Sequence, residues 1–131
     1  MIYLDSSALL KLLHEEPESG ALADWLTGQT GTALLSSELA NVEVIRACRQ
    51  INPDTLPEAR ALLAGLDLIP LAGAMIAEAT DVGQTTLRSL DAVHLASALS
   101  VRDALSSFIA YDHRLSEAAS AAGLQFLAPG T

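Results

Sequence analysis

Short apolar runs alternate with longer segments of helical character along the whole chain. The apolar runs predict strands at residues 2–4, 33–35, 68–71, 108–111 and 124–127. Helical spacing of apolar residues, together with capping and breaking residues, predicts helices at residues 6–15, 17–26, 57–66, 74–82, 90–101 and 112–122, and one from a Ser36 or Ser37 cap to about residue 51. Strands that alternate with helices indicate an α/β fold, in which a parallel sheet is covered by helices. The 131 residues fit a single domain, residues 1–131.

Two aspartates directly follow predicted strands. Asp5 comes after residues 2–4 and Asp112 after residues 108–111. In open parallel sheets, ligands bind outside the carboxyl ends of the strands, so we expect both carboxylates at that edge. Asp112 can also be a simple helix N-cap, and so can Asp91. Asp5 is harder to explain as a cap because the hydroxyls that follow it can cap the next helix.

Glu43 is an acidic residue in the middle of a predicted helix. It lies between Leu39 and Ala47 on an otherwise apolar face, whereas Glu38 projects about 140° away. The alternative is that Glu43 is simply exposed, or that it pairs with Arg46 three residues later, which is worth a few tenths of a kcal/mol.

The four carboxylates together predict a metal site. If they met without a cation, they would repel one another and raise their own pKa values. An all-oxygen set suits Mg²⁺ or Mn²⁺ better than zinc, and Cys48, the only cysteine, allows no thiolate cage and no internal disulfide. Such metals generate hydroxide and stabilise charge on a phosphoryl group.

Composition narrows the classes of partner. The formal net charge is −9, from 16 acidic and 7 basic residues, which argues against indiscriminate nucleic-acid binding and favours a basic protein partner. A nucleic-acid enzyme whose positive charge comes from bound metal stays possible. No apolar run reaches the roughly 18 residues of a membrane span, and Asp5 interrupts the first apolar stretch. With one cysteine, these features predict a protein of the reducing cytoplasm.

Four segments carry a family resemblance: residues 2–9 (IYLDSSAL), 36–43 (SSELANVE), 88–96 (RSLDAVHLA) and 110–115 (AYDHRL). In this order and spacing the chain resembles the PIN-domain ribonucleases, and within them the VapC-type toxins of bacterial toxin–antitoxin pairs. The resemblance implies a three-layer α/β/α fold with a central parallel sheet. It also implies a VapB-type antitoxin as partner, and a homodimer.

The resemblance also implies roles for particular residues. Asp5, Glu43, Asp91 and Asp112 would form an acidic site that uses Mg²⁺ or Mn²⁺ to cleave RNA. Ser6 and Ser7 would orient Asp5 or a metal-bound water, or else cap the first helix.

Other polar residues are less clearly linked to a function by the sequence. Lys11, Arg46 and Arg88 are candidates for holding RNA phosphates, with simple surface charge as the alternative. His94 is interpreted as a hydrogen-bonded core residue and is left out of the catalytic set.

Three other classes of protein are alternatives to this interpretation. A receiver-type phospho-acceptor domain needs a lysine late in the chain, and the only lysine is Lys11. A haloacid-dehalogenase-type phosphatase needs an aspartate two residues after Asp5, where Ser7 stands. A catalytically silent PIN-like binding module stays open, and a metal-dependent nuclease assay separates it from an enzyme.

Overall fold

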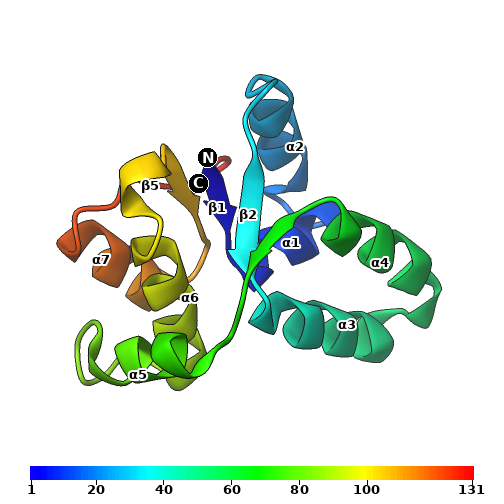
Figure 1. The fold of residues 1–131 in the computed structure, drawn as a ribbon. Coiled ribbons are helices and arrows are strands. Elements are labelled where there is room, and N and C mark those ends of the chain that lie inside the picture. Colours follow the sequence, from blue (N-terminus) through cyan, green and yellow to red (C-terminus); the bar gives the residue numbers. More distant parts are fainter.

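The computed structural model describes residues 1–131 and is built on one five-stranded sheet (Figure 1). All strand pairs are parallel, in the order β3-β2-β1-β4-β5. The strands are β1 (Ile2–Leu4), β2 (Leu34–Ser37), β3 (Asp67–Ile69), β4 (Ser107–Ile109) and β5 (Phe126–Leu127). The strand order changes direction between β1 and β4, and in such sheets the crevice at this point is where ligands bind.

Seven helices cover the two faces of the sheet. They are α1 (Ser6–Leu13), α2 (Ser19–Thr27), α3 (Leu39–Ile51), α4 (Leu56–Ala64), α5 (Gly73–Asp81), α6 (Ser89–Leu99) and α7 (His113–Ala121). In Figure 1, α5, α6 and α7 lie on one side of the sheet and α1 to α4 on the other. The expected three-layer α/β/α fold is therefore confirmed. None of the helices has both the length and the hydrophobicity that a membrane span requires.

The central strand divides the core into two parts. All three residues of β1 are fully buried, as expected for a strand that is covered on both faces. Because side chains alternate along a strand, Ile2 and Leu4 pack with Leu9 and Val44 of α1 and α3. Tyr3 points the other way, into the cluster formed with α6 and α7. Asp5, the residue that follows Leu4, therefore emerges from a strand that is packed on both faces.

The predicted strands and helices are all present, with shifts at their ends. The second helix begins at Ser19 and not at Pro17, and the fourth strand pairs only as far as Ile109. The chain leaves the sheet after Ile109, so that a short loop carries Asp112 to the edge. Ser36 does not cap α3, because it belongs to β2 and its hydroxyl donates to the Leu4 carbonyl at 2.6 Å.

Gly83 lies between α5 and α6, in the connection that leads to Asp91, and has a φ of 73°. A Cβ at this position would also lie 2.8 Å from Cδ2 of Leu87. We expect Gly83→Ala to lower the free energy of unfolding by about 1–2 kcal/mol, because L residues pay roughly that amount in the left-handed region. Urea denaturation measures this change.

Gly20→Ala is the matched control. Gly20 lies in α2, and a Cβ there would meet nothing within 4 Å. Alanine should leave stability unchanged or raise it by up to about 1 kcal/mol. Equal losses at the two positions would contradict the role given to the Gly83 backbone.

Candidate active site

Asp5 ends β1 and caps α1. Its Oδ1 accepts hydrogen bonds from the Ala8 amide at 2.9 Å and from the Ser7 hydroxyl at 2.6 Å, and the residue is only 4% exposed. The interpretation that Ser6 or Ser7 caps this helix was wrong, because both lie inside its first turn. The helix N-terminus stabilises a carboxylate at this position. Oδ2 of Asp5 keeps no hydrogen bond from the protein and is free for a ligand.

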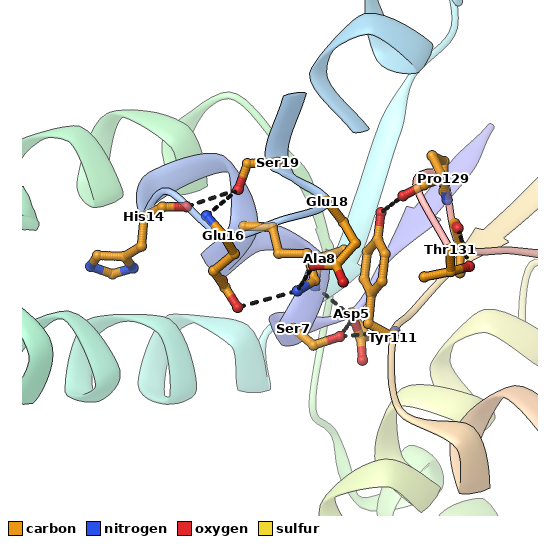
Figure 2. A network of polar contacts seen from close by, with 12 residues as sticks. Asp5, Ser7, Ala8, His14, Glu16, Glu18, Ser19, Tyr111, Pro129 and Thr131 are labelled. Carbon is orange, nitrogen blue, oxygen red and sulfur yellow. Dashed lines mark hydrogen bonds and ion pairs between the residues drawn. The ribbon is translucent and has the colours of Figure 1, made fainter. Parts of the chain in front are cut away.

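Ser7 joins the first strand–helix turn to the loop after β4. Its Oγ donates to Asp5 and accepts from the Tyr111 amide at 3.2 Å (Figure 2). The Asp5 amide in turn donates to the Ile109 carbonyl at 3.1 Å. These bonds hold the turn that carries Asp5 against the loop that carries Asp112.

Asp112 repeats the arrangement at the end of β4. Its Oδ1 accepts from the amides of Arg114 and Leu115 at 3.0 and 3.1 Å, which caps α7. Oδ2 lies 3.4 Å from Nη2 of Arg88. Both strand-end aspartates therefore use one oxygen to start a helix and leave the other for the site.

Glu43 lies at the border of the buried stripe of α3 formed by Ala40, Val44 and Cys48. Its side chain is 24% exposed, and its Oε1 lies 2.7 Å from both the Ser6 hydroxyl and Nε2 of His94. Ser6 thus orients Glu43, whereas Ser7 orients Asp5.

Glu38 is placed differently from Glu43, as the helix geometry predicts. It precedes the first residue of α3 and is exposed. Its Oε1 accepts from the Leu71 amide at 3.4 Å, beyond the carboxyl ends of β2 and β3, and it has no contact with Ser6 or His94.

Arg88 brings the last two carboxylates together. Its Nε lies 3.1 Å from Oδ2 of Asp91, in the first turn of α6, and its Nη2 reaches Asp112. The Arg88 side chain is 63% exposed, so this bridge is a weak, exchangeable contact.

The pKa values reflect two different environments. Burial raises the pKa of Asp5, and the nearby Asp91 adds to this, although His94, Ser7 and the Ala8 amide oppose the shift. Burial would also raise the pKa of Glu43, but the bonds from His94 and Ser6, with Arg88 nearby, outweigh it and the pKa is lowered. Asp5 therefore lies within electrostatic reach of Asp91, and Glu43, Asp91 and Asp112 all lie within electrostatic reach of Arg88.

No three acidic, histidine or cysteine side chains stand close enough around one point to hold a metal ion. In their place, the positive charge of Arg88 spans Asp91 and Asp112. The donor set nevertheless fits a hard cation, since it consists of carboxylate oxygens and contains no sulfur.

The three candidate RNA-binding cations are placed differently. Lys11 pairs with Glu16 at 3.2 Å and Glu18 at 2.9 Å, and lies over the Tyr111 ring. The two glutamates outweigh partial burial and raise the pKa of Lys11. Arg46 is exposed on α3 and free of ion pairs, and only Arg88 contacts the predicted acidic site.

His94 is a buried, hydrogen-bonded residue, as the sequence analysis expected, but its contacts with Tyr3 and Glu43 were not predicted. Tyr3 and His94 contact each other and lead to Glu43, but they lie 91 residues apart. The one available signal was that His94 lies almost one helical turn beyond Asp91, on a buried helix.

Comparison with known proteins identifies the class to which this fold and site belong. The PIN domain family model matches residues 2–121. Ribonuclease VapC47 of Mycobacterium tuberculosis is 44% identical over 133 residues, which cover 99% of this chain and 98% of the relative. The chain therefore belongs to the PIN-domain family and, within it, to the VapC-type ribonucleases.

Solved structures agree with the fold. The crystal structure of M. tuberculosis VapC20, described as a sarcin-ricin loop cleaving toxin, has a TM-score of 0.76 at 16% identity, covering 98% of this chain and all of that one. A chain of the Rickettsia felis VapBC2 complex, solved with a promoter DNA fragment, has a TM-score of 0.75 at 10% identity and covers 98% and 99%. Both likenesses concern the three-layer architecture.

The opposite pKa shifts predict opposite pH effects on stability in metal-free buffer. A raised pKa means that ionised Asp5 costs stability at neutral pH, so Asp5→Asn should be more stable than the wild type there. This advantage should shrink as pH falls through the folded pKa of Asp5.

Glu43→Gln should show the reverse. Its lowered pKa contributes stability above the unfolded value near 4.3, so the variant should be less stable at pH 7, by about 1 kcal/mol. That deficit should vanish as pH falls. Urea unfolding from pH 7.5 to 3.5 in EDTA measures both differences, with Glu38→Gln as control. Parallel pH profiles for the two variants would show that the assigned environments are wrong.

Proposed function

We propose that this chain is an endoribonuclease that hydrolyses RNA phosphodiester bonds and acts as the toxin of a toxin–antitoxin pair. The observation that supports the proposal is that Asp5 and Asp112 lie beyond the carboxyl ends of the neighbouring strands β1 and β4, and that Arg88 joins Asp112 to Asp91. Glu43 is bound by Ser6 of α1 and His94 of α6. The 44% identity to a named ribonuclease along almost the entire chain also supports the proposal.

We propose that the four carboxylates hold Mg²⁺ or Mn²⁺. When bound, the metal would lower the pKa of a water molecule and offset charge on the scissile phosphate. In the reaction, the water oxygen bonds to phosphorus, one P–O bond to ribose breaks, and a proton ends on the leaving oxygen. The chain contributes fixed ligands: Asp5 and Asp112 are anchored by the helices that they cap, and Glu43 by Ser6 and His94.

Arg88 and Arg46 are the residues that we propose to hold RNA phosphates. Arg88 already lies at the site, and release from Asp91 and Asp112 on metal binding would free its guanidinium. Arg46 lies three residues beyond Glu43 on α3 and is exposed. Lys11 is poorly suited, because two glutamates already neutralise it.

The partner that we propose is a VapB-type antitoxin with a basic inhibitory segment. The net charge of −9 and the acidic edge of the sheet favour a cationic ligand. A PIN-like fold also occurs in the Rickettsia felis VapBC2 complex. Homodimer formation and action in the cytoplasm belong to the same proposal, and the exposed side chains of Val42, Ile51, Ile76 and Leu90 offer apolar surface for contacts between chains.

A nuclease assay tests the proposed activity. Purified protein is incubated with total RNA in Mn²⁺ or in EDTA, and the cut ends are mapped. We expect cleavage only with Mn²⁺, a loss of about 100-fold or more in Glu43→Gln, and near wild-type cleavage in Glu38→Gln, because only Glu43 faces the site.

Thermal unfolding provides a second readout. Millimolar Mn²⁺ should raise the melting temperature of the wild type and do so less in Asp5→Asn and Asp91→Asn, because a ligand that binds only the folded state stabilises it. A melting curve unmoved by metal, with no cleavage of any RNA, would favour a catalytically silent binding module.

The antitoxin proposal predicts a salt-dependent encounter. We expect the partner to place an arginine against Asp5, Asp91 or Asp112, since its planar guanidinium pairs with carboxylates in a bidentate way. Association rates, measured by stopped flow at 50 and 300 mM salt, should fall as salt rises. Replacement of that arginine by alanine should restore cleavage more than it weakens binding. Inhibition that survives loss of every basic residue in the segment would show simple steric blocking.

A further inference from the structure

A buried chain of hydrogen bonds leads from the core to the Glu43 carboxylate. The Tyr3 hydroxyl lies 2.8 Å from Nδ1 of His94, and Nε2 of His94 lies 2.7 Å from Oε1 of Glu43. Tyr3 is fully buried and His94 is 2% exposed. These hydrogen bonds run from β1 to α6 and then to α3, and they end at the half-buried carboxylate of Glu43.

The direction of the last hydrogen bond follows from the chemistry of its two partners. A carboxylate can only accept, so Nε2 must carry a hydrogen whether the imidazole is neutral or charged. The other ring nitrogen, Nδ1, is then the atom that hydrogen-bonds with the Tyr3 hydroxyl. A tyrosine hydroxyl has an ordinary pKa of about 10, so the Tyr3 hydroxyl carries its proton at neutral pH.

Aromatic packing prevents the imidazole from turning. The His94 ring meets the Tyr3 ring edge-on, at 79° and 5.9 Å between centroids. Tyr3 in turn stacks on Phe108, at 6° and 5.3 Å. Rotation of His94 would break the bond to Tyr3 and the bond to Glu43 together, so Nε2 is held pointing at the carboxylate.

We propose that His94, oriented by Tyr3, is a positioning residue of the site, and this rests on the proposed function of Glu43. Glutamate is a flexible side chain, and Glu43 projects from the border of a helix face. Donors from α1 and α6, the Ser6 hydroxyl and the His94 imidazole, both hold its Oε1. Oε2 has no donor from the protein and is thereby presented to a metal ion. His94 itself touches neither RNA nor metal.

Two substitutions of His94 separate this role from simple core packing. In His94→Gln the amide nitrogen can take the place of Nε2 and still reach Glu43. In His94→Asn the shorter amide can only replace Nδ1, near Tyr3. A residue that merely fills the core would make both variants similar, with effects that follow their loss of stability.

The measurements are Mn²⁺ affinity by isothermal titration and the kinetics of RNA cleavage, with urea unfolding to confirm that each variant is folded. We expect His94→Asn to lower Mn²⁺ affinity and kcat by about 10–100-fold, as for other groups that orient metal ligands, with KM for RNA changed by less than about threefold. His94→Gln should recover most of both losses. Tyr3→Phe keeps the ring stack but removes the hydroxyl, and it should lower Mn²⁺ affinity several-fold. If His94→Asn does not fold, this variant tests the proposal, and an unchanged Mn²⁺ affinity in Tyr3→Phe would overturn it.

Wild-type Mn²⁺ affinity and kcat in folded His94→Asn would overturn the proposal, as would equal losses in the asparagine and glutamine variants. The ¹⁵N spectrum of histidine-labelled, metal-free protein tests the contact without any activity. It should show a hydrogen on Nε2 of His94, with a signal that shifts in Glu43→Gln. If the wild type cleaves no RNA but the order of Mn²⁺ affinities holds, the proposed function fails and the positioning role stands.

Discussion

The rest of the site depends on the burial of a carboxylate at the end of the central strand. Packing on both faces of β1 leaves Asp5 only 4% exposed, and this burial raises its pKa. The Ala8 amide, the Ser7 hydroxyl and the N-terminus of α1 compensate part of the cost. Because Ser7 also binds the Tyr111 amide, the same contacts position the loop that carries Asp112. One desolvated charge therefore determines how the two strand-end turns meet.

Glu43 differs from Asp5 because it is held by hydrogen bonds without being deeply buried. Its position at the border of the buried stripe of α3 leaves room for solvent or a ligand, while Ser6 and His94 bind one oxygen and lower its pKa. Asp5 and Glu43 thus differ in the cost of their charge although they lie in one site. Such divergence is common where carboxylates share a functional site.

Arg88 places a positive charge among the carboxylates at this edge of the sheet. Its guanidinium spans Asp91 and Asp112, lies within electrostatic reach of Glu43, and offsets part of their negative charge. An exposed ion pair of this kind contributes little to stability, so a metal ion or a basic partner segment can replace it at small cost. The arrangement is consistent with the proposed function, in which each of these cations would meet the same carboxylates.

The hydrophobic pattern by itself determined the α/β architecture, since strands covered on both faces need continuous apolar runs and helices between them. It also determined that Asp5 and Asp112 lie at one edge of the sheet, because the chain leaves successive parallel strands at the same edge. Helix geometry also separated Glu43 from Glu38, because residues five positions apart on a helix project in different directions. Tertiary structure alone decided that Ser6 serves Glu43, that Lys11 is neutralised by Glu16 and Glu18, and that His94 is held by Tyr3. Sequence spacing predicts which face of an element a side chain occupies, but the choice among neighbouring polar partners depends on how the helices pack, and packing depends on the whole chain.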